Sequence, residues 1–382
     1  MQAIDAPARA DIEYSDEEAL LARSAAEFLD KRSDFAAVRA AMATPAGYDR
    51  ALYEDMARLG WLGLALPGAH GGADMPVSAL ATLAEAMGRH LLASPFLAST
   101  LAAQALLHAG NPRQQAWLGP IARGEAIAAL ALIEPSGSSE LASIAAQATD
   151  TKGGFELRGQ KMRVLDAQNA DVVLIALRRA GKLGLMLATR AQLAGRMRDE
   201  VLIDETRRSA RIHLDGLSLG REALLDGGDA ALALAHVQRV AWLLLAAEMA
   251  GGAEGAMQLT LEYLKTRTQF GKPIGSYQAL KHPMVEIMCA IEHGRSLLYH
   301  AATLFDRSDP EREIALRMAK AQLAETYAYA VDRSIQFHGA IGFTYECHAQ
   351  LFFRRAQWAQ SSFGDVAHHR RHLAELLWPR GG

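Results

Sequence analysis

The chain has 382 residues, half of them apolar, so it can bury a large core and, at roughly 100 to 200 residues per domain, should form two or three domains. Its 40 basic and 43 acidic residues nearly cancel, which argues against the positive field of a nucleic-acid binder. Its two cysteines, Cys289 and Cys347, lie outside any Cys–Cys or Cys–His ligand spacing, so we expect no disulfide framework and no metal site.

The N-terminus indicates neither export nor membrane insertion. Its opening residues carry acids where a signal peptide has bases and an apolar run. No stretch reaches the roughly 18 uninterrupted apolar residues of a membrane-spanning helix. We therefore expect a soluble, cytoplasmic protein without a membrane partner.

The first part of the chain, residues 1–126, has apolar residues at helical spacing, as at Leu21, Ala25 and Leu29. Proline and glycine interrupt this pattern at several points, for example around Pro67. The pattern predicts a helical N-terminal domain.

Short apolar runs separated by glycine and polar clusters follow in residues 127–227. Residues 155–158, 171–176 and 210–214 have the composition of strands, and a Lys-Gly-Gly cluster at 152–154 precedes the first of these runs. This pattern of short apolar runs predicts a small β domain in the middle of the chain.

Helical periodicity returns in residues 228–382, in long segments at roughly 230–268, 276–307, 311–338 and 345–361 and in a shorter last one. The order of helical domain, β domain and helical bundle lacks the strand and helix alternation of a doubly wound sheet.

A glycine-rich segment, Gly251-Gly252-Ala253-Glu254-Gly255, lies inside the first of these helical segments. A dinucleotide-binding GxGxxG loop needs a strand before it and a helix after it, and no strand precedes this segment. We interpret its glycines as points of close helix packing.

Two segments of the C-terminal region combine cations, aromatic residues and glycines. In residues 263–278 a helix ends at Gly271, so that Arg267 can present a bidentate phosphate fork and Phe270 a flat surface beside it. In residues 334–346 a helix ends in a glycine-permitted turn that exposes backbone amides, which suits an anion or a pyrophosphate. Spacing alone favours a solvated arginine and a core phenylalanine over a binding role.

Both segments resemble the C-terminal signature of the acyl-CoA dehydrogenase family, in the order and spacing found there. Residues 59–67 resemble the family's N-terminal motif, and residues 131–135 and 157–162 resemble its two mid-chain motifs. The resemblance extends over residues 15–377, which is nearly the whole chain.

The resemblance implies an acyl-CoA dehydrogenase-like fold, with an α-helical N-terminal domain, a β-barrel-like middle domain and a C-terminal four-helix bundle that hold FAD without a Rossmann motif. It also implies the reaction. A carboxylate base removes the α proton of an acyl-CoA thioester while the β hydrogen leaves as a hydride to the flavin, and the protein orients and polarises the thioester.

In this family each flavin is shared between two subunits of a tetramer, and the bundle of the neighbouring subunit holds its adenine and pyrophosphate end. By resemblance, the cofactor-binding groups are Arg267, Phe270, Gln278, Gln336 and Gly339, and all of them are present. The resemblance further implies an electron-transfer flavoprotein as the electron acceptor.

The half of the site that holds the flavin ring departs from the family's pattern. The family's hydroxyl before Glu-Pro is Ile133 here, and its Trp-Ile-Thr run is Arg-Val-Leu at 163–165, so hydroxyl donors to the flavin have become apolar. Gly364 stands where the family has its base glutamate, and the family's alternative base position falls near Leu245.

Two carboxylates are candidate catalytic bases. Asp365 is adjacent to the vacant position, although an aspartate there can simply form a turn or cap. Glu248 lies one helical turn after Leu245 and could face the same cavity, although among Ala and Leu residues it can also be a buried, paired residue.

The departures all fall on the flavin-ring side, while the donated side is intact. This asymmetry favours a heteromeric α2β2 enzyme of the type that acts on bulky steroid-derived CoA thioesters, in which this subunit lends Arg267 and Gln336 to a partner's FAD. Two alternatives stay open, namely a homotetramer with its own FAD and a displaced base, and a flavin-free acyl-CoA-binding protein. The basic run at 368–372 is expected to face solvent on the last helix rather than to touch CoA phosphates.

Overall fold

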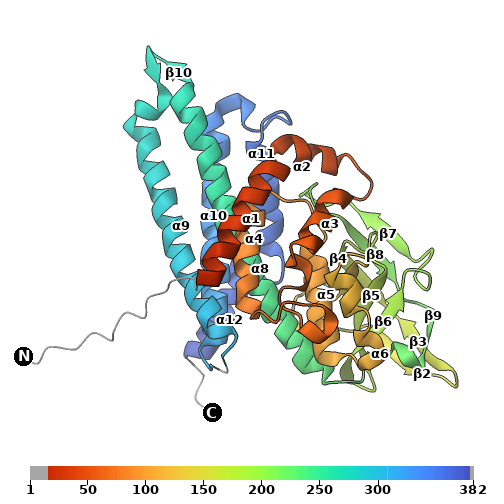
Figure 1. Ribbon diagram of the computed structural model, residues 1–382. Helices are drawn as coiled ribbons and strands as arrows, with labels where there is room; N and C mark the ends of the chain where they lie inside the picture. Colours follow the sequence, from red (N-terminus) through yellow and green to blue (C-terminus); the bar gives the residue numbers. More distant parts are fainter. Residues whose placement is uncertain (1–15, 308, 379–382) are drawn as a thin grey trace, which may run out of the picture.

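The N-terminal part of the chain is helical. Figure 1 shows the computed structural model, which describes residues 16–307 and 309–378. The N-terminal elements are α1 (Asp16–Arg32), α2 (Phe35–Met42), α3 (Arg50–Arg58), η1 (Trp61–Gly63), η2 (Gly68–His70), η3 (Val77–Ala79), α4 (Leu80–Arg89), α5 (Phe96–Ala109), α6 (Pro112–Gln115) and α7 (Leu118–Ala122). Asp34, Asp49 and Asn111 accept hydrogen bonds from first-turn amides of α2, α3 and α6, which satisfies donors that a helix start leaves free.

The middle part is a β domain made of two sheets. Its elements are β1 (Ala128–Ala131), η4 (Leu141–Ser143), β2 (Gln147–Asp150), β3 (Gly154–Arg158), β4 (Gln160–Leu165), β5 (Val172–Arg179), β6 (Lys182–Thr189), β7 (Met197–Glu200), β8 (Ser209–His213), β9 (Leu217–Gly220) and η5 (Arg221–Ala223). One sheet has the order β1-β5-β2-β3-β9 with β6 also paired to β5, and the other has the order β4-β8-β7. The prediction of a β middle domain is confirmed.

The C-terminal part is a helical bundle, as predicted. Its elements are α8 (Ala230–Thr266), β10 (Thr268–Gln269), β11 (Lys272–Pro273), η6 (Ile274–Ser276), α9 (Gln278–Phe305), α10 (Arg312–His338), η7 (Gly339–Ile341), α11 (Ala349–Ser361) and α12 (Val366–Leu377). The β10–β11 hairpin projects from one end of the bundle, away from the middle domain (Figure 1).

Helix α8 runs through the centre of the molecule and packs against α4, α5, α9, α10 and α11. By length and composition alone it could cross a membrane, with a mean hydropathy of 1.5 over its most apolar window. However, 67% of that window is buried inside the protein, so its apolar side chains have protein neighbours. The apolar surface of α8 is therefore accounted for by the core of the bundle.

Glycines allow α4 and α8 to approach closely. A Cβ on Gly251 would lie 1.8 Å from the backbone oxygen of Glu85, and one on Gly88 would lie 2.0 Å from the backbone oxygen of Glu248. A Cβ on Gly255 would likewise lie 2.5 Å from the backbone oxygen of Arg89. The interpretation of the glycine-rich segment as a packing surface is confirmed.

The expected domain boundaries fall in connecting segments. The boundary after residue 126 lies between α7 and β1, and the boundary after residue 227 lies between η5 and α8. Both remain predictions about independent folding units, because the apolar core is continuous across the three parts.

Candidate active site

A pocket of about 270 Å³ lies where the three parts of the chain meet. It is lined by α5, by β1 and the segment after it, by β4, by the segment after β7, and by α11 with the residues that follow it. The lining residues are Ala98, Leu101, Leu130, Leu132, Ile133, Gly137, Ser139, Arg163, Leu165, Val201, Leu202, Ile203, Gln357, Trp358, Ser361, Ser362 and Phe363. Its position between domains and its apolar lining are typical of a small-molecule site.

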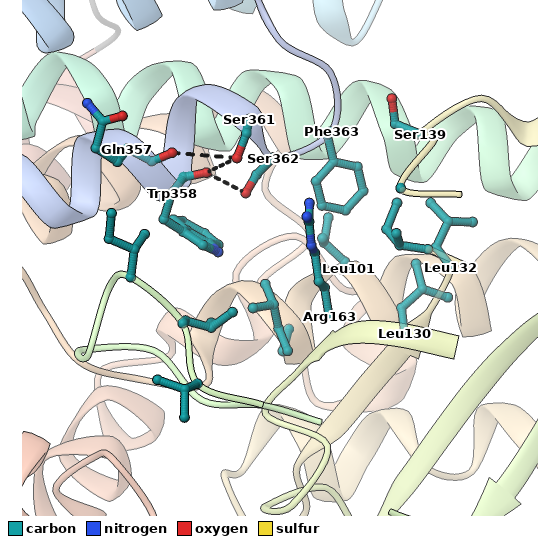
Figure 2. Close-up of a pocket in the computed structure, with 17 residues that line it drawn as sticks. Leu101, Leu130, Leu132, Ser139, Arg163, Gln357, Trp358, Ser361, Ser362 and Phe363 are labelled. Atoms are coloured by element: carbon teal, nitrogen blue, oxygen red, sulfur yellow. Dashed lines mark hydrogen bonds between the residues drawn. The ribbon is translucent and has the colours of Figure 1, made fainter. Parts of the chain in front are cut away.

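Arg163 is the one ionisable residue in this lining, and the lining contains no carboxylate. A bulge between Lys161 and Val164 in the pairing of β4 with β8 places Arg163 at a φ of +51°, and its amide donates to Glu200 Oε2 at 2.7 Å. Figure 2 shows its side chain extending toward the ring of Phe363. Within the part of the chain that the structure describes, its guanidinium has no hydrogen-bond or ion-pair partner.

The pocket offers few hydroxyl donors. Ser361 and Ser362 bond back to the carbonyl of Trp358, at 3.1 and 2.8 Å, so their hydrogens are used within the end of α11 (Figure 2). Ile133 and Leu165, which stand at two of the family's hydroxyl positions, both line the pocket. Besides Ser139 and Gln357, the lining therefore presents a largely apolar surface and one cation where the family places flavin-ring donors.

Hydrogen bonds from the bundle hold the backbone at Phe363, which lines the pocket, and at the adjacent Gly364. Trp242 Nε1 donates to the carbonyl of Phe363 at 2.9 Å, and the buried Lys320 Nζ donates to the carbonyls of Ala359 and Gly364 at 3.1 and 3.4 Å. Burial lowers the pKa of Lys320 to about 7. These bonds fix the backbone at the position where the family has its base.

Asp365, the first candidate base, is exposed and lies outside the pocket lining. It is the N-cap of α12, where its side chain accepts a hydrogen bond from the His368 amide at 2.7 Å. This is the capping role that an aspartate in a turn commonly has. The geometry thus gives Asp365 a structural task and does not direct it at the pocket.

Glu248, the second candidate base, is buried and bonded to two arginines. Its Oε1 accepts from Arg207 at 2.5 Å and from Arg355 at 2.6 Å, and Arg355 also pairs with the buried Asp204. Burial raises the pKa of Glu248, but the two guanidinium charges and their hydrogen bonds outweigh it and leave the pKa below its usual value. A carboxylate so stabilised is a weak base.

This buried cluster joins the domains rather than facing the main pocket. Glu248 comes from α8, Arg355 from α11, and Arg207 and Asp204 from the loop between β7 and β8. Glu248 and Arg207 line a separate cavity of only about 20 Å³. Glu248 is therefore not among the residues that line the main pocket, and its role as a catalytic base stays a prediction.

A second buried pair shapes the loop beside the pocket. Lys161 Nζ donates to Glu134 Oε1 at 2.7 Å, and the other contacts of Glu134 are the amides of Ala145 and Ala146 at 2.9 Å. Burial raises the pKa of Glu134, but these hydrogen bonds outweigh that effect and leave the pKa below its usual value. The two mid-chain motifs thus meet in a buried ion pair and not in surface pairing.

The five predicted cofactor-binding residues gather at the far end of the bundle. They are Arg267 at the C-cap of α8, Phe270 in the β10–β11 turn, Gln278 at the start of α9, Gln336 in the last turn of α10, and Gly339 after it. All five are exposed, and the Phe270 side chain is 91% exposed. Among the described residues, the side chains of Arg267, Gln278 and Gln336 have no bonded partner.

Contacts between α8 and α10 hold this end together. The ring of Tyr263 stacks on His338 with centroids 4.4 Å apart, and Thr260 bonds to Ser334 at 2.8 Å. Gly339 has φ +68° and ψ −147°, a conformation that is essentially restricted to glycine. The two sequence segments of the resemblance are therefore adjacent in space and have a defined backbone.

The structure brings the cofactor-binding residues together but separates them from the pocket. Sequence reasoning treated Arg163 only as a departure from the pattern and missed it as the cation of the pocket, for which the Arg-Val-Leu run was the available signal. It also missed Arg207 and Arg355 as partners of Glu248, because no local pattern links residues so distant in the chain.

Comparison with known proteins defines the class. The acyl-CoA dehydrogenase N-terminal domain family matches residues 15–125, and the acyl-CoA dehydrogenase C-terminal domain family matches residues 226–377. The chain is 33% identical to acyl-CoA dehydrogenase IpdE2 of Mycobacterium tuberculosis, over 95% of this chain and 98% of the relative. The chain belongs to the acyl-CoA dehydrogenase family and is an FAD-dependent acyl-CoA oxidoreductase.

Further relatives extend the comparison. The chain is 28% identical to benzylmalonyl-CoA dehydrogenase of Aromatoleum aromaticum, over 90% of this chain and 93% of the relative. A solved variant of the Tcur3481-Tcur3483 steroid ACAD is 27% identical, with a TM-score of 0.85 over 94% of this chain and 97% of that chain. The ChsE4-ChsE5 complex from M. tuberculosis, 24% identical with a TM-score of 0.87 over 97% and 100%, shares the fold.

Proposed function

We propose that this chain is the cofactor-donating subunit of a heteromeric, tetrameric acyl-CoA dehydrogenase. Its bundle end would complete an FAD site whose flavin-ring half and catalytic base belong to a second acyl-CoA dehydrogenase-like subunit. The observation that carries the proposal is the contrast between five exposed cofactor-binding residues and a pocket of the same chain that contains no carboxylate.

The bundle end fits the adenine and pyrophosphate half of FAD. Arg267 offers a planar guanidinium with no competing partner, which suits bidentate contact with a phosphate. Phe270 offers an exposed ring, and the turn at Gly339 leaves backbone surface free of a side chain. When bound, FAD accepts the hydride from the β carbon of the acyl group.

The pocket of this chain does not supply the proton-transfer step. Removal of an α proton needs a base within hydrogen-bond reach of the substrate carbon. The guanidinium of Arg163 offers hydrogen-bond donors and no acceptor, so it cannot act as that base. Asp365 caps α12 and Glu248 is bonded to Arg207 and Arg355, so we assign the base to the partner subunit.

A second candidate function is a homotetramer in which each chain turns over substrate in its own pocket. The pocket at the domain junction favours it, because a cavity of about 270 Å³ approaches the lower end of the range for small-molecule sites. A flavin-free acyl-CoA binder is disfavoured, because Arg267 and Gln336 would have no ligand in it.

For the substrate we propose a bulky, ring-containing acyl-CoA thioester, since a similar solved protein is a steroid ACAD and a similar relative is a benzylmalonyl-CoA dehydrogenase. We further propose an electron-transfer flavoprotein as electron acceptor and a cytoplasmic location. Neither a nucleic-acid nor a membrane partner enters the proposal.

The test is the FAD content of the chain, measured by visible absorbance. Purified alone, the chain should contain almost no FAD, and co-expression with a second acyl-CoA dehydrogenase-like subunit should yield about one FAD per pair of unlike chains together with turnover of an acyl-CoA. One FAD per chain in the protein purified alone would overturn the proposal in favour of the homotetramer. Binding of acyl-CoA without flavin in both preparations would favour the third class.

A further inference from the structure

Three metal-ligating side chains converge beside the pocket, away from the cofactor-binding end. Glu140 lies just before η4, in the segment that follows β1, whereas His368 and His372 are both on α12. Because the two histidines are four residues apart, they lie on the same face of their helix. That face is turned toward Glu140.

The ligand atoms are close enough to share one ion. Glu140 Oε1 lies 2.6 Å from His372 Nε2 and 3.4 Å from His368 Nδ1, and the potential ligand atoms of the three residues all lie within 4.8 Å of one another. Glu140 and His372 are hydrogen-bonded at present, and an ion would replace that bond with a small outward shift of the two side chains, since zinc holds nitrogen and oxygen ligands at about 2.0 to 2.2 Å.

The second nitrogen of His372 has a carboxylate of its own. His372 Nδ1 lies 3.2 Å from Glu375 Oε2, on the side of the ring opposite to Glu140. A metal-binding histidine usually donates its other ring N–H to a carboxylate, which fixes the ring orientation and the tautomer. Glu375, three residues further along α12, is close enough to take this role when an ion is bound.

Burial and charge also suit a cation. The side chains of His368 and His372 are 13% and 24% exposed, and that of Glu140 is 42% exposed, so the cluster is sheltered but open to an entering ion. The neighbouring cation Arg317 is bonded to Glu313 at 2.7 Å and stacks on the ring of Trp242 at 4.3 Å, so its charge is partly compensated.

The basic run at 368–372 does not simply face solvent, which corrects the expectation from the sequence. His369 is fully buried against Trp242, with ring centroids 5.5 Å apart. His368 and His372 instead lie next to Glu140, which belongs to the middle domain. His369 therefore belongs to the core, whereas His368 and His372 belong to the cluster with Glu140.

We propose that Glu140, His368 and His372 form a binding site for a divalent transition-metal ion of the zinc class. Two imidazoles and one carboxylate are a donor set that zinc accepts, and three protein ligands leave a fourth position for water. The ion would tie the loop that contains Gly137 and Ser139 to α12 and so fix two lining residues of the pocket.

The test is a calorimetric titration of the metal-stripped full chain with Zn²⁺ in a non-chelating buffer near neutral pH. We expect one saturable equivalent per chain in the wild type, and loss of that equivalent in both His368→Ala and His372→Ala. Glu140→Gln should abolish or strongly weaken binding, and Glu375→Gln should weaken it by roughly 10- to 100-fold, since Glu375 orients a ligand. The matched control is His293→Ala, because His293 is an exposed histidine on α9 outside the cluster, and it should keep full binding.

Thermal unfolding of each variant provides the second measurement. Zn²⁺ should raise the melting temperature of the wild type and of His293→Ala, but not that of His372→Ala, because an ion stabilises only a folded state that binds it. A metal-free melting temperature near the wild-type value shows that a variant is folded. No saturable binding by the wild type, or equal binding by His368→Ala, His372→Ala and the wild type, would overturn the proposal.

Discussion

The far end of the bundle and the pocket at the domain junction differ in how their polar groups are used. At the bundle end, Arg267, Gln278 and Gln336 are exposed and unbonded among the described residues. Around the pocket, Ser361 and Ser362 bond to the carbonyl of Trp358, and Lys320 bonds to the backbone of Ala359. A free guanidinium at a helix end contributes little to folding and is available to a ligand, as the proposal of a donated cofactor site requires, whereas the bonded groups around the pocket contribute to the fold.

This contrast teaches that a carboxylate near a vacant catalytic position is not yet a base. Asp365 and Glu248 lie close to the two base positions in sequence, but both are already bonded to partners that keep them in structural roles. The four predictions that follow each test one side of the contrast.

The largest effect is expected at Glu248. Glu248→Ala leaves Arg207 and Arg355 buried without their shared counter-ion, so the free energy of unfolding should fall by about 3 to 5 kcal/mol. Urea unfolding followed by circular dichroism measures this loss. The exposed Glu27→Ala is the control and should change the free energy by no more than about 0.5 kcal/mol. Wild-type stability combined with lost turnover in the assembled enzyme would instead make Glu248 the base.

Arg267 tests the bundle end. Arg267→Ala should weaken FAD binding by the assembled enzyme by about 1.5 to 3 kcal/mol, the usual contribution of a hydrogen bond to a charged group. Stability of the isolated chain should not change, because the side chain has no partner there. FAD titration of the complex measures the effect, and Arg113→Ala, another exposed arginine, is the matched control. Equal FAD affinity in both variants would contradict the donor role.

Lys320 tests the wall of the pocket through pH. Burial lowers its pKa from 10.5 to about 7 in the folded protein, against the opposing charge of Asp365, so between these values the unfolded chain binds a proton that the folded chain lacks. Its contribution therefore makes stability rise with pH in this window, by at most about 1.4 kcal/mol per pH unit. Lys320→Met should remove that slope from urea unfolding measured at several pH values. An unchanged slope would show that Lys320 stays charged in the fold.

The smallest effect is expected at Asp365. Asp365→Ala removes the N-cap of α12 and should cost about 1 kcal/mol of unfolding free energy, while Asp365→Asn preserves the cap and should cost almost nothing. Turnover of the assembled enzyme with Asp365→Asn should equal that of the wild type. A large fall in kcat with this variant, without loss of stability, would identify Asp365 as the base and would show that this chain supplies the catalytic carboxylate.

Much of the fold could be predicted from the sequence because the relevant signals are local. The expected helical segments at 230–268 and 311–338 correspond to α8 and α10 within two residues at each end. The strand-like runs at 155–158, 171–176 and 210–214 overlap β3, β5 and β8, whereas the other strands of the middle part, β1, β2, β4, β6, β7 and β9, were not predicted as strands. Short strands carry a weak periodic signal, and their pairing depends on residues far away in the chain.

The sequence by itself determined the family and the order of helical, β and helical parts, and it predicted which residues bind the cofactor, because motifs and periodicity are properties of neighbouring residues. Only the tertiary structure decided that Glu248 is bonded to Arg207 and Arg355, that Arg163 enters the pocket, and that Glu140 meets two histidines of α12. The physical reason is that the charge, burial and pKa of a side chain depend on partners that folding brings together from distant parts of the chain.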